Sequence, residues 1–211
     1  NSFNGNDYFE ITTLEETLPG TVAHLIINIE TSDGYTSNSI VPIQIGTPTV
    51  YDPVGPDDYG YYIYDNEDIN YVLAPTYNWI EIDPSYDSVV QSQDLNLSDG
   101  GNGNNEIYSI ETINLPFEFY FYGEPYSQIT VSTNGWIVFG QTLTRSFRNH
   151  SVPGAGGPSP MVAVFWDDLK TGNNGEVYKY FGDNYVVIEW SEMRTYPNND
   201  SQTFQVILFD N

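Results

Sequence analysis

The sequence predicts an all-β protein built from antiparallel β-sandwich modules. Apolar and polar residues alternate with a period of two over many short stretches, a pattern typical of half-buried strands. Gly, Pro, Asn and Asp punctuate these stretches, and no stretch shows a convincing helical period. Because most connections are short and no crossover helix is expected, neighbouring strands should run antiparallel.

Residues 1–46 are predicted to form part of an immunoglobulin-like module. The stretches "TVAHLIINIE" (21–30) and "SIVPIQIG" (39–46) alternate, and "SDGY" between them is a turn signal. Pro42 cannot donate to a ladder, which predicts that its strand lies at a sheet edge. With a weaker strand near 8–12, this module has too few strands for a sandwich of about seven.

Residues 47–58 are predicted to be a linker, because Pro and Gly interrupt any pattern there. Residues 59–211 are predicted to form a second, larger sandwich of the jelly-roll kind. "TNGW" and "FGDNY" are its hairpin signals, and "SDGGNGNNE" (98–106) is expected to be a flexible loop. Its expected strands are 61–64, 78–82, 115–122, 128–131, 135–140, 161–166, 176–181, 185–191 and 203–209.

The composition excludes several classes of function. Five Lys and Arg face 29 Asp and Glu, for a formal charge of -24, so nucleic acid and anionic membrane surfaces are disfavoured partners. The same charge favours divalent cations, although it also suits a solubilising surface in salty or extracellular conditions. Cysteine is absent, which excludes thiol catalysis and Cys zinc sites. No apolar run reaches the ~18 residues that a membrane span needs.

The chain shows neither an initiator Met nor a signal peptide and starts "NSFNGNDYFE". It is therefore expected to be a mature product or a piece of a longer protein.

Two adjacent acids, Asp167 and Asp168, follow the apolar stretch "MVAVFW". Trp166, the last residue of that stretch, is predicted to be buried. If the strand continues, the two carboxylates point to opposite faces. A glycosidase pair needs its carboxyls about 5–9.5 Å apart across one bond, so catalysis is the weakest interpretation. Calcium binding and a structural role in the following turn both stay open.

A second acidic cluster lies in "GPDDYGYYIYDNEDINY", where Asp57, Asp65 and Asp68 are the candidate calcium ligands. Calcium takes about six to eight hard oxygens, including carbonyls from irregular backbone. The segment lacks the Gly and the distal Glu of an EF-hand, so that interpretation fails. A calcium site that fixes the linker to the second module and a solvated acidic loop are the two alternatives.

Three aromatic residues are candidates for a sugar-binding platform. Tyr62 and Tyr64 would share one face of the 61–64 strand, and Trp79 is near them in sequence. Aromatic rings stack on sugars, but they also fill β cores, and the core interpretation is favoured.

No catalytic residue is predicted. The two histidines, His24 and His150, lie in a core-like strand and in a loop, and neither G-x-S-x-G nor HExxH is present. Asn96, Asn149 and Asn199 fit the N-glycosylation pattern.

Three stretches, "VSTNGWIVFG", "MVAVFWDDL" and "GEVYKY", resemble the nidogen-type extracellular domain. The order of "LPFEFYFYG", "STNGWIVFG", "RNHSVPGAGGP", "FWDDL" and "TFQVILFD" is closer still to modules appended to secreted bacterial peptidases of the subtilisin and gingipain types. This resemblance spans roughly 57–210. Residues 1–50 resemble the later half of the immunoglobulin-like domain that often precedes such modules.

The resemblance implies a non-catalytic β-sandwich on a secreted or surface-displayed bacterial protein, with calcium as an expected ion. The family's sandwich normally continues beyond "FQVILFD", so this chain is expected to be truncated there. The predicted function is structure or attachment, with other domains or copies of the same protein as partners, and a fibre or multi-copy assembly as one form. A carbohydrate-binding module of a secreted hydrolase, with glycans as partners, is the alternative.

Overall fold

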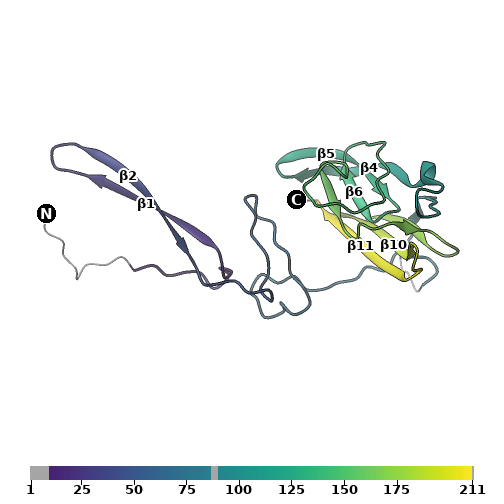
Figure 1. The fold of residues 1–211 in the computed structure, drawn as a ribbon, viewed down its shortest axis with the longest axis horizontal. Coiled ribbons are helices and arrows are strands. Elements are labelled where there is room, and N and C mark those ends of the chain that lie inside the picture. The colour runs from purple at the N-terminus through teal and green to yellow at the C-terminus, as the bar shows by residue number, and fades with distance from the viewer. Residues whose placement is uncertain (1–9, 87–89, 211) are drawn as a thin grey trace. The chain divides into compact units, whose positions relative to one another are not determined.

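The computed structural model describes residues 10–86 and 90–210 of the 211-residue chain. The chain divides into two compact units, residues 1–78 and residues 79–211. The described residues form strands, turns and a single 3-10 turn, with no α-helix among them, so the all-β prediction is confirmed (Figure 1). No helix in the described residues is long and apolar enough to cross a membrane.

The first unit contains one hairpin, β1 (Val22–Glu30) and β2 (Thr36–Gln44), paired antiparallel with Ile26 opposite Ile40. Gly34 takes a positive φ of 86° in the predicted turn, which Gly adopts without steric cost. Ile26 and Ile40 are 65% and 61% exposed, so this face of the hairpin is uncovered. The weak strand expected at 8–12 begins outside the described residues.

Residues 61–64, predicted as a strand, form a loop with a single bridge between Val54 and Ile63. The reason is a competing acceptor. The carboxylate of Asp57 accepts the backbone N–H groups of Tyr59 and Gly60, just before the segment, and of Tyr61, its first residue, at 2.8–3.0 Å, so the segment starts in a turn instead of a ladder. Residues 59–78 group with the first unit, whereas the sequence analysis placed the boundary at residues 47–58.

The second unit is a sandwich of two antiparallel sheets. One sheet has the order β11-β10-β9-β3, with β8 also paired to β10, and the other has the order β4-β5-β6-β7. The strands of the first sheet are β3 (Gln93–Asp94), β8 (Leu169–Lys170), β9 (Glu176–Phe181), β10 (Tyr185–Thr195) and β11 (Ser201–Phe209). Those of the second are β4 (Ile110–Phe121), β5 (Glu124–Ser132), β6 (Trp136–Phe139) and β7 (Met161–Ala163), and the 3-10 turn η1 (Glu106–Tyr108) precedes them.

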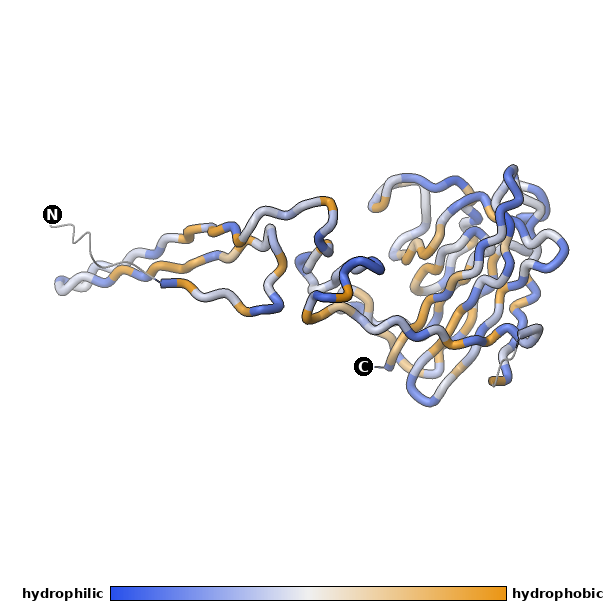
Figure 2. The backbone as a smooth tube through the Cα atoms, turned by 90° about the horizontal axis from the view of Figure 1, so that it is seen from below, coloured by the Kyte–Doolittle hydropathy of each residue, from blue (hydrophilic) through white to orange (hydrophobic). Residues whose placement is uncertain are grey.

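The core lies between the two sheets because alternate residues of each strand face inward. Along β10, Val186, Ile188 and Trp190 join the core, as do Ile129 and Val131 of β5. Each such buried side chain contributes about 1.5–3 kcal/mol. In Figure 2, hydrophobic stretches follow the strands of this unit and hydrophilic stretches mark many of its connections.

Residues 78–82, predicted as a strand, form no ladder in the structure. Their backbone instead bonds to side chains of the sheet. Ile80 exchanges hydrogen bonds with the Gln205 side chain at 3.3 and 3.1 Å, and the N–H of Ile82 donates to Glu189 at 3.4 Å. Alternation in this segment therefore reflects burial of Ile82 against β10 and β11 rather than strand pairing.

Candidate functional site

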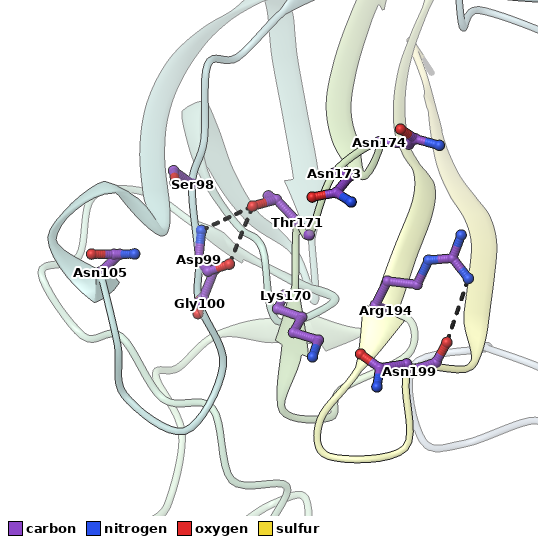
Figure 3. A pocket seen from close by; sticks show the side chains of 11 residues that line it. Ser98, Asp99, Gly100, Asn105, Lys170, Thr171, Asn173, Asn174, Arg194 and Asn199 are labelled. Carbon is purple, nitrogen blue, oxygen red and sulfur yellow. Dashed lines mark hydrogen bonds between the residues drawn. The ribbon is translucent and has the colours of Figure 1, made fainter.

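A polar pocket of about 590 Å³ opens beside β8 and β10 in the second unit. Figure 3 shows eleven residues around it, from the 98–105 loop, from β8 and the turn that follows it, and from β10 and the turn after it. None of these eleven residues carries an apolar side chain. The pocket is within the size range of small-molecule sites, which is about 300–1,000 Å³.

The pocket wall is fixed by Asp99, which is only 4% exposed. Its carboxylate accepts hydrogen bonds from the Thr133 hydroxyl (2.7 Å), the Asn134 amide (3.3 Å) and the Gly101 N–H (2.8 Å). Burial raises the pKa of Asp99, and the hydrogen bonds from Thr133 and Gly101 oppose that shift. The 98–106 loop, expected to be flexible, is therefore held by a buried polar anchor.

The "TNGW" hairpin connects this anchor to the strand that carries the pocket's lysine. Asn134 is fully buried, and its side-chain oxygen accepts the N–H of Leu169 at 2.9 Å. Gly135 has a φ of 72°, and a Cβ there would lie 2.0 Å from the carbonyl oxygen of Phe165. Only glycine fits at this contact, so "TNGW" and "FWDDL" are two halves of one packed unit.

Two cations, Lys170 and Arg194, line the pocket from directly opposite positions on β8 and β10. They are two of the five basic residues in a chain of formal charge -24. Lys170 Nζ lies 5.5 Å from the centroid of the Tyr196 ring, and Arg194 donates to the carbonyl oxygen of Asn199 at 3.4 Å. Among the described residues, no carboxylate forms an ion pair with either cation. The pair therefore places two basic groups in a pocket that Asp99 also lines, and the charge of Lys170 acts to lower the pKa of the nearby Asp168.

Four asparagines complete the polar lining: Asn105, Asn173, Asn174 and Asn199. All four are exposed, and each amide offers both donors and acceptors. In Figure 3, Asn199 lies beside Arg194, whereas Asn105 lies apart from both cations, beyond Gly100. The arrangement suits a ligand with several hydroxyl groups and a negative charge.

Asp167 and Asp168 hold backbone amides near this pocket. Both oxygens of Asp168 lie within 3.1 Å of the Asn102 N–H, and Asp167 accepts the N–H of Asp168 at 2.9 Å. Burial raises the pKa of Asp168, while the hydrogen bond from Asn102 lowers it. Asp168 therefore ties the end of the "FWDD" stretch to the 98–106 loop, which agrees with the structural interpretation.

Trp166 is 8% exposed, so its predicted burial is confirmed. It packs with Trp136 in a small separate cluster, and both indole N–H groups donate to the carbonyl oxygen of Ser146, at 3.3 and 2.9 Å. The strand before it, β7, ends at Ala163, three residues earlier than predicted. A second, more apolar groove of about 680 Å³ borders Trp166.

The other predicted calcium ligands lie in the first unit. Asp65 accepts the N–H of Glu67 at 2.7 Å, and Asp68, which is 4% exposed, accepts the N–H of Asp65 at 2.8 Å. Asp57 organises its own loop through the three amides described above. In residues 10–86 and 90–210, no group of three or more His, Asp or Glu is arranged to hold a metal ion. Calcium therefore stays a prediction.

The predicted aromatic platform is divided between the two units. Tyr62 and Tyr64 stack in the first unit, with ring centroids 5.9 Å apart. Trp79 belongs to the second unit, where its indole N–H donates to Glu81 at 3.2 Å. The predicted glycosylation residues Asn96 and Asn149 are exposed, like Asn199 at the pocket.

Sequence reasoning did not identify Lys170, Arg194 or Asp99 as site residues. Lys170 and Arg194 are 24 positions apart in a chain with only five basic residues. That scarcity was the available signal, but only the β8–β10 pairing places the two residues opposite one another.

Comparison with known proteins finds a matching family model and two relatives of the chain. A family model described as "NIDO related" matches residues 76–211. Alpha-tectorin from Homo sapiens is 28% identical over 128 residues, and alpha-tectorin from Mus musculus is 27% identical over 128 residues. Each match covers 47% of this chain and 6% of the relative, so the chain spans a small part of these proteins. No solved structure gives a significant match.

Proposed function

Because this chain belongs to the NIDO-related family, we propose that it is a non-catalytic structural module of a large extracellular protein. The observation that carries the proposal is the extent of the family match, which includes every strand of the sandwich in the second unit. Alpha-tectorin supports the same conclusion, because the matching segment is one small part of a much longer chain. Other domains of the same protein are the expected partners.

The parent protein is proposed to be a secreted or surface-displayed bacterial protein, with a peptidase of the subtilisin or gingipain type as the neighbouring domain. This finer proposal rests on the order of motifs from "LPFEFYFYG" to "TFQVILFD". Reading the full-length gene product tests the proposal. A neighbouring peptidase domain is expected, and a parent with only intracellular domains would contradict it.

Localisation and lack of catalysis are tested together in the source organism. Antibodies raised against residues 79–211 should label intact, unpermeabilised cells or the culture medium. A parent protein that lacks residues 79–211 should keep the specific activity of any catalytic domain it has, while its retention at the surface falls. Labelling that requires permeabilised cells would contradict an extracellular module, and loss of specific activity would contradict a non-catalytic one.

A carbohydrate-binding module is the second candidate, and the stacked pair Tyr62 and Tyr64 favours it. Tyr62 is 37% exposed, so part of its ring is available to a sugar face. A glycan array with the wild-type chain and Tyr62→Ala tests this candidate. Loss of a neutral-sugar signal in Tyr62→Ala would support it, and an array without any such signal would exclude it.

A further inference from the structure

We propose that the pocket formed by the 98–105 loop, β8 and β10 binds an acidic sugar unit, one that carries a carboxylate or sulfate group. The proposal goes beyond a structural role for the module and concerns residues distant in sequence from Tyr62 and Tyr64. Its basis is the combination of paired cations, amide side chains and a wall that the protein's own hydrogen bonds hold in place.

The cation pair provides the charge recognition. Lys170 and Arg194 are cross-strand partners, and like charges directly opposite one another on a sheet destabilise the fold. Among the described residues neither charge lies within ion-pair distance of a carboxylate, and Lys170 interacts with Asp168 only at longer range, although the chain contains 29 acidic residues. A ligand carboxylate or sulfate would neutralise this local repulsion, and an arginine fork can bind either group through two parallel hydrogen bonds.

The surrounding amides provide recognition of hydroxyl groups. Asn173 and Asn174 project from the turn after β8, and Asn199 lies in the turn after β10, so donors and acceptors flank the cations on two sides (Figure 3). Sugar hydroxyls both donate and accept hydrogen bonds, as amide groups do. The ring of Tyr196, beneath Lys170, restricts where the ammonium group lies.

The wall of the pocket is preorganised. Asp99 and Thr171 bond to one another through their backbones and through the Thr171 hydroxyl, at 3.1–3.3 Å. Asp99 is in turn held by Thr133 and Asn134, two buried residues in the turn between β5 and β6. Because these contacts exist without a ligand, little ordering cost should accompany binding.

An acidic peptide is the competing occupant, and the lining favours the sugar. Strand addition, one common mode of peptide recognition, pairs the peptide main chain with an open sheet edge, whereas the polar groups of this pocket are mostly side chains. None of the eleven lining residues has an apolar side chain. The pocket volume of about 590 Å³ accommodates one or two sugar units.

The test uses the full 211-residue chain, produced in a host that does not N-glycosylate, because Asn199 lines the pocket. Binding is measured by calorimetry at about 0.15 M salt, where the Debye length is about 8 Å. The probes are a galacturonic acid tetrasaccharide, a sulfated galactose tetrasaccharide, a neutral galactose tetrasaccharide and a tetraglutamate peptide. The first two probes distinguish a carboxylate from a sulfate as the recognised group.

The variants are Lys170→Gln and Arg194→Gln, with Lys179→Gln as the matched control. Lys179 also lies on the first sheet of the second unit, and its Nζ is likewise 5.5 Å from an aromatic centroid, that of Phe181. Each pocket variant should weaken binding of an acidic sugar by about tenfold or more, because a charge-assisted hydrogen bond is lost. Lys179→Gln should leave binding unchanged.

Binding of either acidic sugar that is lost in the pocket variants and kept in the control supports the proposal. Equal affinity for tetraglutamate or for the neutral sugar would overturn it, as would equal losses in Lys179→Gln. No binding of either acidic sugar would overturn it as well. Surface labelling and retention of the parent are measured independently, so failure here leaves the structural function standing.

Discussion

Glu189 is a fully buried carboxyl group on β10, on the opposite face from the core residues Ile188 and Trp190. Its side chain accepts hydrogen bonds from the Ile82 N–H and the Gln205 amide, at 3.4 and 3.3 Å. Burial, followed by the negative charge of Glu81, raises the pKa of Glu189 to about 8. The folded protein therefore holds a proton there that the unfolded chain releases at a much lower pH.

This shift predicts that stability falls as the pH rises. The stabilising proton is fully present below the pKa of an unfolded glutamate, which is about 4.3, and is lost as the pH rises through about 8. The expected slope from this group is about 1.4 kcal/mol of unfolding free energy per pH unit inside that window. Denaturant unfolding measures this slope at several pH values, from about 4.5, just above the pKa of an unfolded glutamate, to about 9, above the pKa of folded Glu189.

Glu189→Gln should flatten that slope and make the protein more stable than wild type near pH 9, since no charge has to be buried. Glu111→Gln, at an exposed position on β4, is the control and should keep the wild-type slope. Burial also raises the pKa of Asp99 and Asp168, so a smaller slope of the same sign should remain in Glu189→Gln. Unfolding free energies that rise toward pH 9 in the wild type would contradict the assignment.

Trp166→Ala should lower the unfolding free energy by about 3–5 kcal/mol, the usual cost of removing a large core aromatic. The buried ring packs with Trp136, and its loss would leave a cavity and remove a donor to Ser146. Trp166→Phe should cost less because part of the ring volume is kept. Chemical denaturation followed by circular dichroism measures both, and a cost below about 1 kcal/mol for Trp166→Ala would contradict the packing.

Gly135 in the β5–β6 hairpin is required because of a close backbone contact, and not only because of its positive φ. Gly135→Ala would place a Cβ 2.0 Å from the Phe165 carbonyl oxygen, so backbone would have to move. Gly140→Ala is the matched control, because Gly140 also has a positive φ, 90°, but nothing lies within 4 Å of its Cβ position. Thermal unfolding should show a much larger loss for Gly135→Ala, and equal losses would mean that backbone conformation alone sets the cost.

Sequence alternation predicted strands well where a ladder and a buried face coincide. β9 matches its predicted range of 176–181, and β10 and β11 extend only a few residues beyond theirs. The errors at 61–64 and 78–82 share one cause. In both segments, side-chain acceptors such as Asp57 and Glu189 bind backbone N–H groups that a strand would place in a ladder. The period-two alternation of apolar residues indicates which side chains are buried. It does not indicate which acceptor a backbone N–H group will bind.

The candidate pocket was beyond sequence reasoning for a different reason. An acidic cluster such as the one in residues 57–68 can be recognised from the sequence, because its acidic residues lie close together along the chain. Lys170 and Arg194 become neighbours only through the antiparallel register of β8 and β10. A bulge between Trp190 and Met193 also shifts the pairing of β10 with β11 just before Arg194, and period-two alternation does not predict such a shift.

The prediction that calcium binds the acidic chain concerns the whole molecule and can be tested directly. Calcium above its dissociation constant should raise the melting temperature, since a ligand at 100 times that constant adds about 2.7 kcal/mol. Chelator should lower the temperature by several degrees, and Asp65→Asn with Asp68→Asn should reduce the effect of calcium. Equal melting temperatures in calcium, in magnesium and in sodium chloride of matched ionic strength would show that screening, and not a site, stabilises the fold.

We expect the chain to associate with other copies of itself through exposed strand edges. β11 pairs with β10 on one side only among the described residues, so its other edge presents unpaired backbone groups. The β1–β2 hairpin exposes Ile26 and Ile40, and a two-stranded hairpin alone is marginally stable. Both features favour contact with another copy, whereas a charge of -24 opposes it through mutual repulsion.

The salt concentration should therefore decide whether the chain is monomeric or associates, because salt screens the repulsion between copies. At about 0.01 M salt the Debye length is about 30 Å, and the chain should be monomeric in light scattering. At about 1 M salt the length falls to about 3 Å, and larger species should form. Phe209→Lys, which adds a charge at the exposed end of β11, should suppress them, whereas Leu143→Lys in an exposed loop should not. Because an edge-to-edge contact between different surfaces propagates unless it closes into a ring, the species should grow with concentration rather than stop at a dimer. A monomer that unfolds cooperatively and stays monomeric at high protein concentration in about 1 M salt would refute assembly through these edges.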